Sequence, residues 1–417
     1  MTVEGTGKGS LVSAMFLVAG CCIGGGMLAL PVATGVLGLM PSMLIMGLCW
    51  AAMTATGLLL VEASLWFEEG AHVITMVTRL LGPIARGVAW ILYLYIGYAS
   101  LVAYTASGGD YIASTVTCAG GISVSKGLAC TLFALVFGSI LYLGNTLVGR
   151  INTILFIGMI GAYALLVTVG IPEVQGELLR YQRWSGATLA FPLMLTAFSF
   201  QTIVPSLTPY LDRNVRKLRV AVAGGTTIAF GVYLLWEVLI LGIVPVEGSN
   251  GLAAALEQGQ AATHFLSAAA ESPWVAQVAT FFAFFALVTS FLAIAMGLFD
   301  FLSDGLKIPR RGKGELTLAT MILLPTLYFA VFYERAFIVA LDTSGGLGDT
   351  VLNGIFPVMM VWAGRYSYFN HSVPGLRGGR PLLILLAAFY LFAFLQEVLV
   401  LTGGIQLIYD LTGTSDF

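Results

Sequence analysis

The sequence predicts an all-α polytopic membrane protein built as one domain. Of its 417 residues, 58% are hydrophobic and only 10% are charged, whereas charged residues make up about 25% of an ordinary soluble domain. The apolar residues extend along the whole chain in runs that can cross a bilayer, for which a helix needs about 20 residues. The formal net charge of -2 is close to zero, so no basic surface for nucleic acid is expected.

Eleven apolar runs are separated by charged or turn-rich segments. Residues 9–61 carry no charge and are divided into two spans by the stretch from Pro31 to Pro41, which contains Gly35 and Gly38. The other spans are expected at 87–109, 127–145, 151–171, 187–210, 219–243, 275–299, 316–333, 338–363 and 381–402. The tenth is the weakest of these, because Asp342, Gly345, Gly346, Gly348 and Asp349 interrupt it.

The distribution of Lys and Arg predicts the orientation, because these residues favour cytoplasmic loops. With the N-terminus in the cytoplasm, all but four of the 19 basic residues fall on the cytoplasmic side. The exceptions are Lys126, Arg180, Arg183 and Arg335. An odd number of spans then places the C-terminal tail on the outer, periplasmic side.

The first span contains a break near its centre. Gly20, Gly24, Gly25 and Gly26 fall within seven residues, and glycine is a poor helix former. Small residues also allow close packing of membrane helices, but four glycines at mid-membrane favour an unwound segment. Unwound backbone presents N–H and C=O groups that hydrocarbon cannot satisfy and that a substrate or an ion can.

The sixth span, residues 187–210, contains a second predicted break. Ser199 and Gln201 lie at mid-depth, and Pro205 follows them. A proline-kinked helix whose polar side chains bond to its own carbonyls is the alternative. Two broken spans five spans apart are typical of two inverted five-helix repeats that form the substrate site between them. Repeat one then covers about 9–171, repeat two about 187–363, and the helix at 381–402 is additional.

The two breaks predict a site for a zwitterion. Free N–H groups at the start of the outer half of span one favour a carboxylate, and carbonyls at the end of its inner half favour a cation. No Lys, Arg, Asp or Glu lies in either break, so the pocket selects a neutral side chain. Phenylalanines at the second break and tyrosines at 93, 95, 98 and 104 of span three favour an aromatic one. The residues expected at the substrate are Cys21, Cys22, Ile23, Gly24, Gly25, Gly26, Tyr95, Phe198, Ser199, Phe200 and Gln201.

Three segments carry a family resemblance: GCCIGGGMLALP in span one, FPLMLTAFSFQTIVPSL followed by YLDRNVRKLR at span six, and TSFLAIAMGLFDFLSDG in span eight. Over nearly the whole chain the sequence resembles the hydroxy and aromatic amino acid permease family, and most of all its tyrosine-specific members. The resemblance implies the LeuT-type fold of the amino acid/polyamine/organocation superfamily and proton-driven import across the bacterial inner membrane. Cys21 and Cys22 stand where small hydroxyl residues are expected, and Gly25 where alanine is common, so tyrosine, phenylalanine and tryptophan are not ranked.

Titratable side chains inside spans are costly and are functional candidates. Glu237 and Glu397 lie deepest and are the candidates for proton coupling. Both fall in the outer part of their spans, so a place in an outer vestibule is the alternative. Glu62, Asp110 and Asp342 lie nearer the span edges, where a solvated or interface role is expected.

A sodium site is the competing hypothesis. A LeuT-type alignment implies that the carbonyls of Gly20 and Ile23 face Ala286, Thr289 and Ser290 of span eight. These oxygens suit a hard cation, although a Thr-Ser pair commonly bonds to its own helix. The family resemblance favours the proton, and no cofactor or other metal is expected.

Other functional classes are disfavoured. The three histidines, His72, His264 and His371, lie in separate loops, and no peptidase, hydrolase or nucleotide-binding motif is present, which argues against an enzyme. A channel would need a selectivity filter or charged rings. The sequence therefore predicts a carrier with an amino acid as substrate and membrane lipid around it. A carrier of branched or small neutral amino acids is the main alternative.

Overall fold

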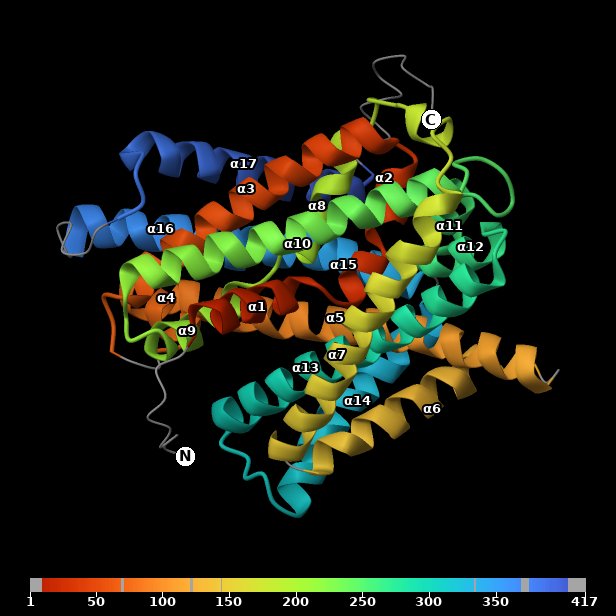
Figure 1. The fold of residues 1–417 in the computed structure, drawn as a ribbon. Coiled ribbons are helices and arrows are strands. Elements are labelled where there is room, and N and C mark those ends of the chain that lie inside the picture. The colour runs from red at the N-terminus through yellow and green to blue at the C-terminus, as the bar shows by residue number, and fades with distance from the viewer. Residues whose placement is uncertain are drawn as a thin grey trace.

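The computed structural model describes residues 10–68, 71–120, 123–143, 145–333, 335–368 and 375–403. This part of the chain is a helical bundle (Figure 1), without β-strands apart from one isolated bridge between Gly38 and Gln182. Lys8, His371 and the tail after residue 403 fall outside it. The helices are α1 (Leu11–Cys22), α2 (Leu30–Gly35), α3 (Leu39–Ser64), α4 (Val73–Leu81), α5 (Pro83–Gly120), α6 (Lys126–Ser139), α7 (Asn145–Gly170), α8 (Phe191–Ala197), α9 (Val204–Tyr210), α10 (Val215–Ile243), α11 (Leu252–Gln258), α12 (Ala262–Ala269), α13 (Pro273–Leu306), α14 (Lys313–Phe332), α15 (Ala336–Thr343), α16 (Phe356–Ala363) and α17 (Gly379–Leu401).

Shorter helical pieces connect these elements. Two π-helical pieces flank α16, and we call the longer one, Ser344–Ile355, the π segment. It joins α15 to α16, so the glycine-rich stretch expected to interrupt span ten lies in a helical span over 336–368. The 3₁₀ pieces are Gly25–Leu28, Ile140–Leu143, Ile171–Glu173, Leu178–Arg180, Ala187–Ala190 and Gln201–Ile203.

The membrane spans agree with the prediction with one difference. Among the described residues, nine helices are long and apolar enough to cross a membrane, and α1 with Gly25–Gly35 forms a tenth span bent by 48°. The predicted fourth span is the exception, because α6 has only 14 residues. Exposed apolar side chains such as Ile154, Phe332 and Leu385 cover the outside of the bundle, as expected for a surface that faces lipid.

The turn between the first two spans requires a glycine. Gly38 has a φ of +83°, a conformation that favours glycine. A Cβ atom there would lie 2.0 Å from the carbonyl oxygen of Tyr181. The neighbouring carbonyl of Leu37 accepts a hydrogen bond from the N–H of Arg183 at 2.7 Å. The loop before span six is therefore packed directly onto this turn.

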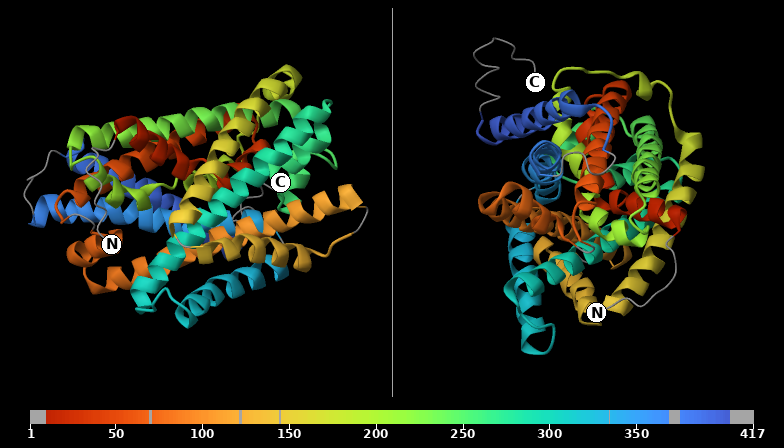
Figure 2. Two further views of the ribbon diagram at one scale, coloured as in Figure 1. Left: turned by 60° about the horizontal axis from the view of Figure 1, so that its bottom comes forward. Right: turned by 90° about the vertical axis from the view of Figure 1, so that its left-hand side faces the viewer.

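The long helices pack around the two broken spans. The long helices α3 and α10 pack side by side, and α1 packs against α10 (Figure 1). α13 packs against α5 and α7, and the π segment packs against α5, α8 and α17. The turned views place α17 at one edge of the bundle and α14 at another (Figure 2). α8 and the π segment are thus buried at the centre, whereas α1 keeps an exposed face with Val12 and Phe16.

Glu62 lies in a buried ion pair, and its expected solvated role is therefore wrong. Arg365 donates from Nε to Glu62 Oε1 and from Nη2 to Oε2, both at 2.6 Å, with the two side chains only 4% and 2% exposed. The same carboxylate accepts the backbone N–H of Leu376 at 3.1 Å. This pair joins the end of α3 to the segments on either side of residues 369–374.

Candidate substrate site at the two helix breaks

The break in span one is present where the glycines predict it. α1 ends at Cys22, Ile23 and Gly24 are extended, and a 3₁₀ turn begins at Gly25. Gly25 and Gly26 are buried. The backbone of this stretch therefore leaves N–H and C=O groups without helical partners at the centre of the bundle.

The freed N–H of Gly25 meets a side chain of α13. It donates to Ser290 Oγ at 2.8 Å, and Tyr104 lies beside the same serine. A Cβ atom on Gly24 would lie 2.4 Å from Ser290 Oγ, and one on Gly25 would lie 2.6 Å from the Tyr104 ring. Both glycines are therefore needed for the close approach of α5 and α13. The group predicted to hold a carboxylate is covered by Ser290 and Tyr104.

The break in span six is also present, and it is a true interruption rather than a proline kink. α8 ends at Ala197, residues 198–200 are not helical, and a 3₁₀ turn at Gln201–Ile203 leads into α9. Thr196 Oγ donates to the carbonyl of Leu341 at 2.7 Å, which ties the end of α8 to α15. Unlike the first break, this one contains side chains that can hydrogen-bond.

The two phenylalanines of the second break point into the protein core. Phe198 and Phe200 are both 0% exposed. The Phe198 ring lies edge-on to Tyr233, with centroids 5.0 Å apart, and Phe200 packs on Gly57 of α3. Gln201 donates from Nε2 to the carbonyl of Met53 at 3.2 Å. These residues anchor the break to α3 and α10.

The other residues predicted to contact the substrate lie in different places. Tyr95 lies near Gly348 of the π segment, whereas Tyr104 lies against Gly25, so Tyr104, rather than Tyr95, is the tyrosine at Gly25. Cys21 is exposed, whereas Cys22 is buried.

The residues implied for a sodium site are only partly brought together. Thr289 Oγ donates to carbonyls of its own helix, at 2.8 Å to Phe285 and 3.2 Å to Ala286. Ser290 Oγ accepts a hydrogen bond from the Gly25 N–H of span one at 2.8 Å. Gly20 packs beside the ring of Phe156. A Cβ atom built on Gly20 would lie 3.1 Å from that ring.

Three residues of α10 hold span one, and the sequence analysis missed two of them. The Tyr233 hydroxyl lies 2.6 Å from the carbonyl oxygen of Cys22 and 2.7 Å from that of Ala197, which links the two breaks. Trp236 Nε1 donates to the carbonyl of Met27 at 2.8 Å. Glu237 is hydrogen-bonded to Thr34 of α2. Positions 233, 236 and 237 share one helix face, and that pattern was the available signal.

Replacing Tyr233 with phenylalanine is expected to destabilise the protein. The change removes only the hydroxyl, whose single hydrogen is shared between two buried carbonyls, and its loss costs about 1–3 kcal/mol. Thermal unfolding in detergent measures the loss. Tyr163→Phe is the matched control, because that hydroxyl bonds a single carbonyl, Val232, at 2.7 Å. An unfolding temperature for Tyr233→Phe as high as that of the control would contradict the linking role.

Three buried carboxyl groups lie near the broken spans. Glu237 is 0% exposed and Glu397 is 1% exposed, and neither oxygen of Glu397 has a hydrogen-bond partner among the described residues. The third, Asp349, was not among the sequence candidates. Its Oδ1 accepts a hydrogen bond from Ser199 of the second break at 2.8 Å. The spacing of Asp349 and Asn353, four residues apart on one helix face, was the signal for it.

A cavity of about 710 Å³ extends from the second break to the end of the bundle that carries α4. Thr202 and Ser206 line it on one side, and Asp300 and Asp304 of α13 on another. His72, at the start of α4, also lines it. Burial lowers the pKa of His72, and the nearby Asp304 acts in the opposite direction. We call this cavity the vestibule.

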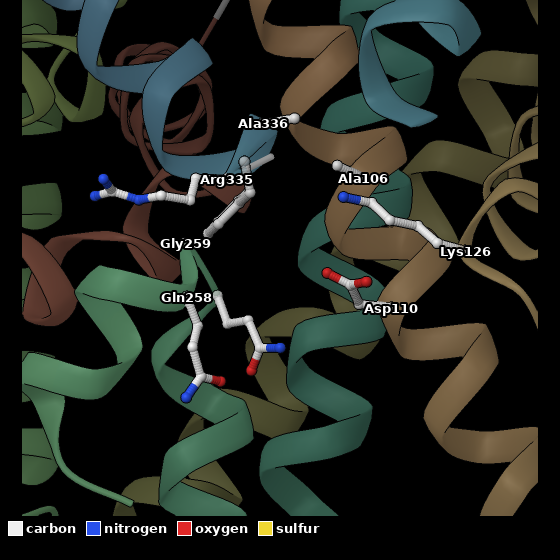
Figure 3. A pocket seen from close by; sticks show the side chains of 9 residues that line it. Ala106, Asp110, Lys126, Gln258, Gly259, Arg335 and Ala336 are labelled. Carbon is white, nitrogen blue, oxygen red and sulfur yellow. The ribbon is translucent and has the colours of Figure 1, made fainter. Parts of the chain in front are cut away.

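A smaller cavity of about 190 Å³ lies at the opposite end of α5. Asp110 and Lys126 lie on one side of it and Gln258 and Arg335 on the other (Figure 3). Asp110 is exposed, in agreement with its predicted place at a span edge. The two cavities thus lie at opposite ends of the bundle.

Comparison with known proteins gives the family. The model of the tryptophan/tyrosine permease family matches residues 7–397. The chain is 31% identical to "Tyrosine-specific transport system 1" of Haemophilus influenzae over 382 residues, which is 90% of this chain and 93% of the relative. It is 28% identical to "Tryptophan-specific transport protein" of the same organism, over 86% of this chain and 88% of the relative. Such relatives are transport proteins rather than enzymes. The chain belongs to the tryptophan/tyrosine permease family.

Proposed function

We propose that this protein is a secondary active transporter that imports aromatic amino acids, most of all tyrosine, by proton symport through alternating access. Two similar proteins are named for tyrosine and tryptophan transport. The observation that carries the proposal is the meeting of two helix breaks, linked through the Tyr233 hydroxyl. Such paired breaks are typical of transporters that bind substrate between repeats.

The substrate would replace contacts that the protein makes with itself. Its α-carboxylate would take the Gly25 N–H from Ser290 Oγ, and its ring would displace that of Tyr104 beside Gly25. A site that a tyrosine side chain of the protein itself fills suits an aromatic amino acid. A branched or small neutral amino acid, the alternative, would fill less of the space that the Tyr104 ring vacates.

The helix contacts support two inverted repeats at about 9–171 and 187–363. α1 packs on α10, and the corresponding pieces α8 and α9 pack on α3. α13 packs on α7, and the corresponding contact joins α5 to α15 and the π segment. Each of these contacts between the repeats therefore has an equivalent contact between the corresponding helices, as an inverted-repeat transporter requires. α17 is the additional helix.

The proposed location is the bacterial inner membrane, with the N-terminus in the cytoplasm and the C-terminus in the periplasm. Arg79 and Arg86 line the vestibule, and basic residues favour the cytoplasmic side. The vestibule would then be the release path, because it leads from Thr202 at the second break to the cytoplasmic end. The smaller cavity beside Asp110 and Lys126 would face the periplasm.

A proton is the proposed coupling ion, with Glu237 and Glu397 as candidate carriers. Thr34 Oγ lies 2.8 Å from the carbonyl of Leu30 and 3.0 and 2.9 Å from the oxygens of Glu237. One hydroxyl hydrogen cannot serve three acceptors, but a protonated Glu237 would donate to Thr34 while Thr34 donates to Leu30. The alternative is sodium, held by oxygens of Gly20, Ile23, Ala286, Thr289 and Ser290.

Uptake of labelled tyrosine into proteoliposomes tests the function. We expect accumulation under an inward proton gradient, blocked by excess unlabelled aromatic amino acids and not by leucine or serine. Accumulation that requires a sodium gradient would replace the proton with sodium and move coupling to Thr289 and Ser290. Uptake that leucine blocks and tyrosine does not would refute the aromatic substrate while leaving the transport mechanism in place.

A further inference from the structure

The π segment places an unusual carboxyl group against the second break. π-helical turns are rare and are frequent at functional sites, and this segment, Ser344–Ile355, spans 12 residues. Asp349 lies at its centre and is 0% exposed. Its neighbour across the helix interface is Ser199, which lies in the non-helical stretch between α8 and α9.

Hydrogen bonds to Asp349 come from both sides of this interface. Oδ1 accepts from Ser199 Oγ at 2.8 Å and from Asn353 Nδ2 at 2.5 Å. Asn353 Nδ2 also lies 3.0 Å from Ser199 Oγ. The carboxyl group, the amide and the serine therefore form a closed triangle that joins span ten to the unwound part of span six.

The second oxygen of Asp349 has no such partner. Oδ2 is buried and receives no hydrogen bond from the described residues. The Thr196 hydroxyl lies beside the carboxyl group, but its hydrogen is directed to the carbonyl of Leu341. An ionised carboxylate without a counter-charge is very costly to bury in a membrane protein. Asp349 therefore needs either a proton or a cation.

The groups that face Asp349 supply no positive charge. From α5 and α17 the titratable neighbours are Tyr104 and Tyr390. Farther along the π segment, Gly348 packs near Tyr95 and Gly346 packs on Glu397, and Asp342 of α15 interacts with Glu397 and with Arg335. α3, α8 and α16 add no Lys, Arg, His, Asp or Glu at this contact, since Glu62 of α3 is paired with Arg365.

The hydrogen-bond donors around the carboxyl group favour a proton over a metal ion. Ser199 and Asn353 both direct hydrogens at Oδ1, whereas a hard metal ion needs several oxygen lone pairs directed at one point. A proton needs only the one free oxygen, Oδ2.

We propose that Asp349 is a proton-binding site of the transporter and that the broken sixth span responds to its occupancy through Ser199. The inference rests on the proposed function and makes Asp349, rather than Glu237 or Glu397, the carrier of the one coupling proton. A proton from water forms an O–H bond at Oδ2 and neutralises the carboxylate. The Ser199 hydrogen bond to Oδ1 then weakens, because a neutral acceptor is weaker than a charged one. Release returns the proton to water and restores the charged triangle.

The test compares Asp349→Asn with the wild type in proteoliposomes. Asparagine keeps the size and hydrogen bonds of Asp349 but cannot carry the proton. We expect wild-type protein to accumulate tyrosine about tenfold under a gradient of one pH unit at zero membrane potential, since one proton then supplies a factor of ten. Asp349→Asn should reach no accumulation, about onefold, while exchanging internal for external tyrosine at near the wild-type rate.

Thr350→Val is the matched control. Thr350 is buried in the same segment, and its hydroxyl bonds only the carbonyls of Gly346 and Leu347 in its own helix, so this variant should accumulate tyrosine like the wild type. Accumulation by Asp349→Asn, loss of its exchange in folded protein, or wild-type accumulation driven by sodium would each overturn the proposal.

An infrared measurement separates failure of the site from failure of the proposed function. The difference spectrum of the purified protein between acidic and alkaline buffer should contain a protonated-carboxyl band that is lost in Asp349→Asn. This readout does not depend on tyrosine being the substrate. An unchanged band would exclude protonation of Asp349, and absence of tyrosine exchange by the wild type would refute the function alone.

Discussion

Replacing Gly25 with leucine is expected to abolish tyrosine uptake while the protein still folds. A Cβ atom at Gly25 would lie 2.6 Å from the Tyr104 ring, so the ring must move. The leucine side chain then fills the space beside the unwound backbone that the substrate would use. Overpacking costs about 1–3 kcal/mol. If the upper value is lost from the binding of substrate, the affinity falls roughly a hundredfold. Initial uptake rates in proteoliposomes measure the effect.

Two controls separate a blocked site from a misfolded protein. Gly161→Leu makes the same change in α7 at a glycine with no atom within 4 Å of an added Cβ, and it should transport normally. The unfolding temperature of Gly25→Leu in detergent should fall by no more than overpacking explains. Wild-type uptake by Gly25→Leu would show that the substrate does not approach this backbone.

Replacing Arg365 with alanine is expected to cause the largest loss of stability. Glu62 would keep its place in the core with its charge and without its bidentate partner, and one broken buried pair costs about 3–5 kcal/mol. The loss should appear as a lower unfolding temperature in detergent. Most of the loss is expected to come from the unpaired carboxylate of Glu62. The stability lost with the packing of the Arg365 side chain is smaller.

Removing both charges tests that cause. The double variant Glu62→Gln with Arg365→Met should be much more stable than Arg365→Ala, because replacing a buried pair with neutral residues is often close to neutral. Breaking the partly exposed pair of Arg310 with Asp300 by Arg310→Ala should cost about 0–1 kcal/mol. Equal losses for Arg365→Ala and the double variant would mean that packing, not charge, stabilises this junction.

Local sequence features predicted the helix breaks because their cause is local. Four glycines near the middle of span one do not support a continuous helix, and this requires no knowledge of the partner helices. The eleven apolar runs also form helices in the described part of the chain, although α6 is short because Ile140–Leu143 tightens into a 3₁₀ turn.

The direction of side chains and the identity of their partners could not be predicted in this way. Glu62 was expected to be solvated because its partner, Arg365, lies 303 residues away. Phe198 and Phe200 flank the break in sequence, but their rings point into the core. Phe198 packs against Tyr233, and Phe200 packs on Gly57. The residue pattern predicts that Asp349 lies in an interruption of span ten, because a π-helical continuation is not apparent from it.

The contact between Tyr104 and Gly25 has a kinetic consequence for a transporter. If the site is filled by its own side chain, substrate binds only the fraction of molecules in which that ring has moved away. The apparent affinity is then the intrinsic affinity reduced by this fraction. The observed rate of association should also reach a maximum at high substrate concentration. That maximum equals the rate at which the Tyr104 ring moves out of the site. A variant with a smaller residue at position 104 would bind faster and discriminate less between amino acids.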